Sequence, residues 1–181
     1  MKKLLLLLSW LIISNSVNAQ NELNLKGLEN LARQGELTAQ IELANAYRKG
    51  IGVTQDYKTA VKWFTLAAEQ GDAVAQYNLG IIYSFGLGVI HNYRPAIKWY
   101  TLSAKQGNAL AQYNLGRLYY LGKGVPENLV YAHLWAKQAS LNGFETAAEL
   151  TELLTELMTE NQIEKAKRLE KECLIEQYKS C

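Results

Sequence analysis

The sequence predicts an all-α solenoid, a stack of helical hairpins, and three observations lead to this prediction. The segment AQYNLG begins at Ala75 and again at Ala111, and Trp63, Trp99 and Trp135 are 36 residues apart. Apolar residues recur at three- and four-residue steps within each period, as in amphipathic helices. A period between about 20 and 50 residues is typical of solenoid proteins. We interpret the three tryptophans as packing anchors between helices.

The period divides the chain into three full repeats with shorter flanking segments. The repeats are residues 35–70, 71–106 and 107–142. Residues 20–34 are predicted to form an N-terminal capping helix, because LARQG aligns with the end of the later repeats. Residues 143–181 keep the register only in part and are predicted to form a C-terminal capping helical hairpin. Atypical ends are expected because a repeat alone leaves an apolar face uncovered.

Each repeat is predicted to hold two helices joined by a Gly-x-Gly turn. The first helices span about residues 39–49, 73–85 and 109–121, and each ends at a glycine that can adopt the left-handed conformation. The second helices begin after an Asp or Asn, which suits a helix N-cap. The turn glycines are Gly50, Gly86 and Gly122, and the caps are Asp56, Asn92 and Asn128. Small residues beside the apolar stripe indicate a closely approaching helix; they are Ala44, Gly80 and Gly116.

The combined pattern is more specific than the period alone. Ala-x-x-x-Leu, a Tyr, Gly-x-Gly-Val and a helix with Ala-x-x-Trp follow one another in three consecutive copies. This pattern resembles the Sel1-like repeat family, relatives of the tetratricopeptide repeats, over roughly residues 35–143. The resemblance implies a right-handed α-solenoid of helix-turn-helix repeats whose first helices line a concave face.

Residues 1–19 have the features of a secretory signal peptide. Lys2 and Lys3 precede an apolar run, and Val17-Asn18-Ala19 offers a small-residue cleavage site ahead of Gln20. The run is shorter than the about twenty residues that a membrane span needs, and an uncleaved anchor is the alternative. We expect a bacterial protein that is periplasmic or secreted, with a Sec-type signal peptide cleaved after Ala19 and no stable membrane insertion afterwards.

The net charge gives no indication of a nucleic-acid or membrane partner. The chain has 19 Lys and Arg and 17 Asp and Glu, a formal charge of +2. Loss of Lys2 and Lys3 with the leader makes the mature chain neutral. Residues 143–181 carry an acidic excess, which is typical of a solvated terminal element.

The two cysteines, Cys173 and Cys181, lie close together near the end of the sequence. An even number in an exported chain favours a disulfide. Eight residues of continuous helix span about 12 Å, whereas a disulfide needs Cα atoms within about 7 Å. A Cys173–Cys181 bond therefore requires the helix to stop and the tail to fold back. Intermolecular pairing and free thiols are the alternatives.

The sequence lacks the motifs of the hydrolases considered. Some Sel1-like secreted proteins with paired cysteines in each repeat are linked to β-lactams, so the resemblance implies, as the alternative function, a β-lactam or cell-wall binding or hydrolysing protein. However, no Ser precedes a Lys at Ser-x-x-Lys spacing, and no repeat holds paired cysteines. His91 is interpreted as a solvated turn residue and His133 as a partly buried histidine, neither with metal-ligand spacing. We predict no catalytic, cofactor-binding or metal-binding residues, and no enzyme.

Recognition of another protein or peptide is the function that fits a helical solenoid. Residues half a turn from the core stripe of the first helices would face the partner. The expected contact residues are Asn45, Arg48, Tyr77, Ile81, Tyr113, Arg117 and Tyr120, and Ile41 and Ser84 share the same outward face. The two tyrosines of the repeated AQYN segment can equally serve packing. Arg48, Ile81, Arg117 and Tyr120 differ between copies, so repeat packing does not dictate them, and Tyr and Arg are frequent in binding hot spots.

We therefore predict a non-enzymatic protein–protein interaction module without a cofactor or a nucleic-acid partner. The resemblance implies an adaptor of the cell envelope or an effector-immunity-type binder. A structural spacer without a dedicated partner is the third interpretation.

Overall fold

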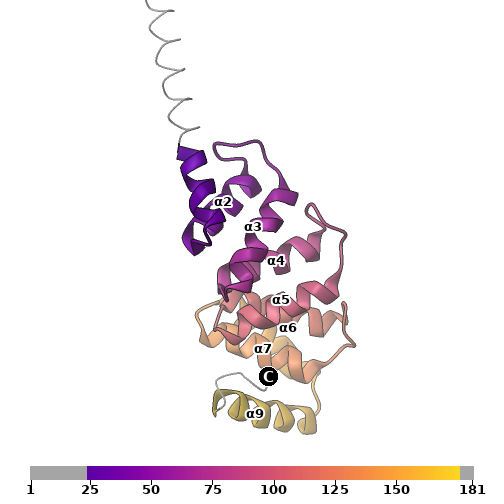
Figure 1. The fold of residues 1–181 in the computed structure, drawn as a ribbon. Coiled ribbons are helices and arrows are strands. Elements are labelled where there is room, and N and C mark those ends of the chain that lie inside the picture. The colour runs from indigo at the N-terminus through magenta and orange to yellow at the C-terminus, as the bar shows by residue number, and fades with distance from the viewer. Residues whose placement is uncertain (1–23, 176–181) are drawn as a thin grey trace, which may run out of the picture. The chain divides into compact units, whose positions relative to one another are not determined.

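A computed structural model describes residues 24–175 of the 181-residue chain. Every regular secondary-structure element in this range is a helix (Figure 1). None of the helices within residues 24–175 combines the length and apolarity that a membrane span requires. The predicted signal peptide lies outside the described residues. The chain divides into two compact units, Met1–Leu66 and Ala67–Cys181.

The first unit contains a helix at residues 24–33, α2 (Leu37–Lys49) and most of α3 (Tyr57–Glu69). Residues 24–33, within the predicted N-terminal cap, are therefore helical as expected. Helix α2 begins two residues before its predicted start. Leu25, Leu28, Tyr47 and Trp63 pack against a small buried core formed by Ala32, Ala39 and Leu43.

The second unit contains the rest of the repeats and the C-terminal hairpin. Its helices are α4 (Ala73–Phe85), α5 (Tyr93–Lys105), α6 (Ala109–Leu121), α7 (Leu129–Leu141), α8 (Thr146–Leu157) and α9 (Glu160–Ile175). Consecutive helices from α4 to α8 pack against each other, and α7 also contacts α9 (Figure 1). The predicted bounds of the first helices in repeats two and three match α4 and α6.

The predicted helix caps of this unit are confirmed. The Asn92 side chain accepts a hydrogen bond from the backbone N–H of Arg94 (3.0 Å) at the start of α5. Gly86 and Gly122 end α4 and α6 with φ of 68° and 60°, a conformation that strains residues with a Cβ. These local signals fix where each helix begins and ends.

The prediction that all three tryptophans anchor the packing is correct for Trp135, which is 1% exposed. In the first two repeats the fully buried ring belongs to the next residue, Phe64 or Tyr100, while Trp63 and Trp99 are only half-buried. Successive residues lie about 100° apart around a helix, so two neighbours can both flank a seam. The repeat spacing alone does not distinguish between them.

Glycine lets the paired helices of this unit approach closely. A Cβ on Gly80 would overlap the buried ring of Tyr100 on α5. A Cβ on Gly116 would lie 3.0 Å from the carbonyl oxygen of Ala132 and 3.1 Å from the backbone nitrogen of Ala136, both on α7. The predicted close approach is therefore confirmed at both glycines.

A buried glutamine links each first helix to the end of the helix before it. Its side-chain N–H donates to a carbonyl in the last helical turn, where carbonyls lack an intrahelical donor. The donors, acceptors and distances are Gln40 to Ala32 (3.1 Å), Gln76 to Ala68 (3.1 Å) and Gln112 to Ala104 (2.9 Å).

In the second unit the same glutamines also accept a hydrogen bond from an amide side chain at the end of their own repeat. Gln106 Nε2 donates to Gln76 Oε1 (2.8 Å), and Asn142 Nδ2 donates to Gln112 Oε1 (2.9 Å). The Gln76 side chain therefore joins the end of α3 to the turn after α5. In the same way, the Gln112 side chain joins the end of α5 to the turn after α7. Gln40, Gln76 and Gln112 recur at 36-residue spacing in the sequence, but this recurrence alone did not predict a bridge between helices.

Within the described residues, the C-terminal segment forms two helices, as predicted, and the second helix begins after a capped turn. Gln162 N–H donates to Thr159 Oγ1 (3.3 Å), and Thr159 N–H donates to Gln162 Oε1 (2.9 Å), which together form a capping box. Cys173, on α9, is buried and is not a free thiol. Its predicted partner Cys181 lies outside the described residues, so the bond between them stays a prediction.

Replacement of Gly80 by Ala tests the close approach of α4 and α5. The new methyl group must displace the Tyr100 ring, and overpacking of this kind costs about 1–3 kcal/mol, more than the helix-propensity gain of about 1 kcal/mol. We expect Gly80→Ala to lower the free energy of unfolding in urea. Gly27→Ala is the matched control, because a Cβ there meets no atom within 4 Å and should leave stability equal or slightly higher. Stabilisation by both changes would contradict the proposed packing.

Replacement of Gln112 by Met tests the glutamine bridge. Met keeps the approximate volume but leaves the amide of Asn142 without its acceptor, and loss of a buried partner costs about 1–3 kcal/mol. We expect thermal and urea unfolding to show a loss of this size. Gln34→Met, at an exposed turn, should change stability by less than about 0.5 kcal/mol. Equal, small effects of the two variants would show that the bridge contributes little.

Candidate functional site

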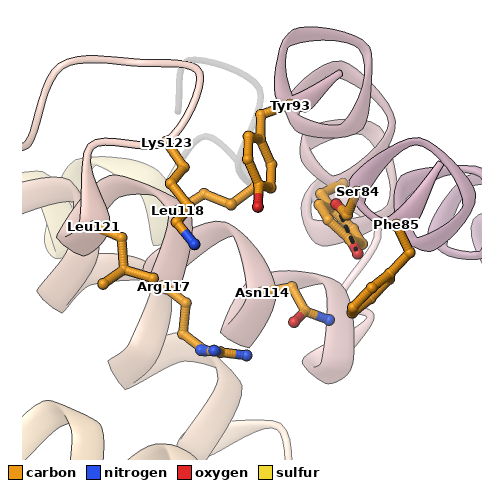
Figure 2. A pocket seen from close by; sticks show the side chains of 9 residues that line it. Ser84, Phe85, Tyr93, Asn114, Arg117, Leu118, Leu121 and Lys123 are labelled. Atoms are coloured by element: carbon orange, nitrogen blue, oxygen red, sulfur yellow. Dashed lines mark hydrogen bonds between the residues drawn. The ribbon is translucent and has the colours of Figure 1, made fainter. Parts of the chain in front are cut away.

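A small pocket lies in the second unit between the C-terminal ends of α4 and α6, beside the start of α5. Its volume is about 150 Å³. Figure 2 shows Ser84 and Phe85 of α4 on one side and Arg117, Leu121 and Lys123 on the other. Three helices and the loop after α6 therefore contribute to one site.

The polar side chains that line the pocket are either positively charged or uncharged. Among residues 24–175, none of those that line the pocket is acidic. The polar residues are Ser84, Tyr93, Tyr100, Asn114, Arg117 and Lys123.

The apolar part of the lining lies largely on the rim. Phe85 is 72% exposed and Leu121 is 47% exposed, whereas Leu118 is only 7% exposed. Phe85 and Leu121 occupy equivalent positions in consecutive repeats, at the last residue of α4 and of α6. Two large apolar side chains at the mouth of a pocket are typical of a surface that a partner covers.

The two cations are held against aromatic rings. The Arg117 guanidinium lies 5.8 Å from the centre of the Tyr113 ring, and Lys123 Nζ lies 5.5 Å from the centre of the Tyr93 ring. These distances are within the range of cation–π attraction. Within residues 24–175, neither cation forms an ion pair.

The hydroxyl groups of the pocket are not arranged for acid–base catalysis. Burial raises the pKa of Tyr100 to about 12, and the nearby Ser84 hydroxyl opposes this rise. Ser84 Oγ donates to the Tyr100 hydroxyl over a long 3.5 Å. A serine nucleophile needs an adjacent general base, whereas a neutral phenol accepts no proton at ordinary pH. The lining is therefore suited to binding.

Of the expected contact residues, the structure places Arg117 in the pocket lining, together with Ser84 from the same predicted outward face. Tyr77 and Ile81 pack against the core cluster around Tyr100, and Tyr120 packs against the cluster of Ala132, Ala136 and Leu154. The centres of the Tyr113 and Phe144 rings lie 4.8 Å apart. Whether these residues also bind a partner stays a prediction.

The two predicted residues of the first unit contact each other. Arg48 Nη2 donates to Asn45 Oδ1 over 3.1 Å, and Asn45 Nδ2 donates to the carbonyl of Ile41 over 3.0 Å. Their role in binding is likewise untested.

Sequence reasoning missed Phe85, Tyr93, Asn114 and Lys123 as pocket residues. Lys123 follows a turn glycine, where the preceding repeat has Leu87. That exchange of an apolar residue for a cation was a signal in the sequence. The other three residues carry no such signal, because their positions are filled by similar residues in another repeat.

Other hollows in the described residues carry charges of both signs. One of about 340 Å³ in the first unit is lined by Glu29, Arg33, Tyr47 and Lys62 among others, and the Tyr47 hydroxyl already donates to Glu29 (3.3 Å). One of about 440 Å³ near the starts of α7 and α9 combines Glu127 with Lys165. Neither has the uncompensated charge of the α4–α6 pocket.

The two histidines lie outside this pocket. His133 is partly buried, as predicted, with Nε2 3.2 Å from Thr155 Oγ1. His91 is exposed. Its ring packs edge-to-face with the Tyr93 ring, and the two ring centres are 4.5 Å apart. The described residues contain no group of three His, Cys, Asp or Glu side chains able to hold a metal ion.

Comparison with known proteins gives consistent matches. The family model described as Sel1 repeat matches residues 37–72, 73–108 and 109–144. A Sel1 repeat protein from Oxalobacter formigenes is 36% identical, with a TM-score of 0.65 over 71% of this chain and 97% of that one. A protective antigen of uropathogenic Escherichia coli strains with an SLR fold is 29% identical, with a TM-score of 0.65. This match covers 85% of the present chain but only 41% of the antigen. None of the curated proteins matches the sequence.

Protonation of His133 should destabilise the fold. Burial, and next the nearby Lys137, lower the pKa of His133 below its usual 6.5. The unfolded chain therefore takes up this proton more readily, so stability that is present above about pH 6.5 is lost as the pH falls through the folded-state pKa. We expect the free energy of unfolding to fall more steeply from about pH 7.5 to about pH 5 in the native chain than in His133→Gln. Parallel pH profiles would contradict this assignment.

Proposed function

The chain belongs to the Sel1 repeat family, and on that premise we propose that it is a non-enzymatic module that binds a partner protein at the α4–α6 pocket. Sel1 repeats are generally protein-interaction modules. One observation supports this site above others: two cations, which form no ion pair within residues 24–175, and two exposed apolar side chains surround a small cavity. This combination provides both anchoring and selectivity in protein recognition.

The size of the pocket favours a side chain of a partner over a free small molecule. Small-molecule sites usually enclose about 300–1,000 Å³, whereas this cavity has about 150 Å³. A cavity of about that size holds a single benzene ring. The exposed Phe85 beside it extends the contact area beyond the cavity. A β-lactam or a cell-wall fragment would find neither the volume nor a general base here.

We place this interaction in the periplasm or outside the cell, because residues 1–19 have the features of a cleaved leader. The proposal includes two roles, an adaptor of the cell envelope and a binder that sequesters a toxic effector. Both require a stable surface that recognises one protein.

Crosslinking affinity capture from the cell envelope tests the proposed function. The full chain with a C-terminal tag is compared with Arg117→Glu, which reverses an exposed charge at the pocket. We expect the native chain to recover a specific protein and the variant to recover about tenfold less, because a reversed charge costs at least about 1.4 kcal/mol of binding. Tyr120 is left unchanged because it packs against the core.

Lys171→Glu on α9 is the matched control, since it reverses an exposed charge away from the pocket. Equal loss in both variants would indicate a nonspecific charge effect, and recovery of no protein by any form would contradict the proposed function. The mass of the captured chain also reports its N-terminus, which export predicts to be Gln20. An intact Met1 in the cytoplasm would contradict export.

A further inference from the structure

The stretch of chain that forms the pocket carries positive charge only. From Ala73 to Pro126 the sequence contains no Asp or Glu but five basic residues, Arg94, Lys98, Lys105, Arg117 and Lys123. The rest of the chain carries an excess of acidic residues that offsets this positive charge. The small net charge of the whole chain therefore gives no sign of the positive segment. An uncompensated patch of one sign attracts and orients a partner of the opposite sign.

The packing of the repeats does not require the two cations at the pocket. Arg117 and Lys123 stand where the preceding repeat has Ile81 and Leu87, so an apolar residue fits either position. Both cations instead rest on aromatic faces, Tyr113 and Tyr93 respectively. Contacts of this kind reduce the side-chain freedom that is lost when an anion binds.

The apolar rim sets the second requirement for a ligand. Phe85 is mostly exposed and Leu121 is nearly half exposed. Both lie next to a cavity of about 150 Å³. An aromatic or branched aliphatic side chain would fill that cavity. A ligand that carries only charge would leave the rim and the cavity unused.

We propose that the α4–α6 pocket binds an internal acidic segment of a partner protein: one apolar side chain enters the cavity while a neighbouring Asp or Glu pairs with Arg117 and Lys123. This inference rests on the proposed function and specifies the chemistry of the partner. The aliphatic Leu121 on the rim favours this occupant over a nucleic acid, because phosphates pair with cations and bases stack on aromatic rings, and neither uses an aliphatic side chain. The partner carboxylate belongs to a side chain, so a free C-terminus is not required.

Selection from a displayed library of random dodecapeptides, with both peptide ends blocked by the display scaffold, tests this proposal. The full chain serves as bait. We expect enrichment of peptides with Asp or Glu within two residues of Phe, Trp, Leu or Ile. A selected peptide, synthesised with acetylated and amidated ends, should bind the native chain at least tenfold more tightly than Arg117→Glu/Lys123→Glu, and more weakly as salt is raised.

The control is Arg168→Glu/Lys171→Glu, which reverses two exposed charges on α9 and should bind the peptide as the native chain does. Circular dichroism and thermal unfolding establish that both double variants are folded. Selection of basic or neutral peptides, equal binding to the pocket variant, or displacement by a single-stranded oligonucleotide would each overturn the proposal. If no peptide is selected although affinity capture recovers a partner at Arg117, the acidic-segment proposal fails while the proposed function stands.

Discussion

The buried glutamine bridge is the interaction on which the arrangement of the second unit depends. Gln76 and Gln112 each donate to the end of the preceding helix and accept from an amide that follows the next helix. A buried amide is stable only when its polar atoms are paired. Small residues between the helices, such as Ala104, Ala111 and Gly116, pack closely but specify little. The bridge therefore fixes the register that these small residues leave open.

Because the packed contact between neighbouring helices is similar in each repeat, the residues at the helix ends can differ from repeat to repeat. Gly80 brings α4 against Tyr100 of α5, and the same ring lines the pocket. Phe85, Leu121 and Lys123 at the pocket mouth lie outside the core cluster around Tyr100, so their positions can differ between repeats without loss of core packing. The exchange of Leu87 for Lys123 illustrates this freedom. A common scaffold thus carries one site whose charge is specific to the third repeat.

The repeat period predicted the helices well because their boundary signals are local. Gly86 and Asn92 act within one turn of chain, so their types alone place a helix end and a helix start. The pocket could not be predicted in the same way, because Ser84 and Lys123 come from different repeats and meet only through helix packing. The buried ring also escaped prediction, since Tyr100 and its neighbour Trp99 both lie near the seam.

The most direct test of the account is amide hydrogen exchange of the full chain with and without a bound partner protein. The central claim is that recognition occurs where the ends of α4 and α6 meet the start of α5. Binding should therefore slow exchange in the turns that follow α4 and α6, residues 86–92 and 122–128. Protection confined to α8 and α9, or to α2, would contradict the claim and would move the binding surface elsewhere in the chain.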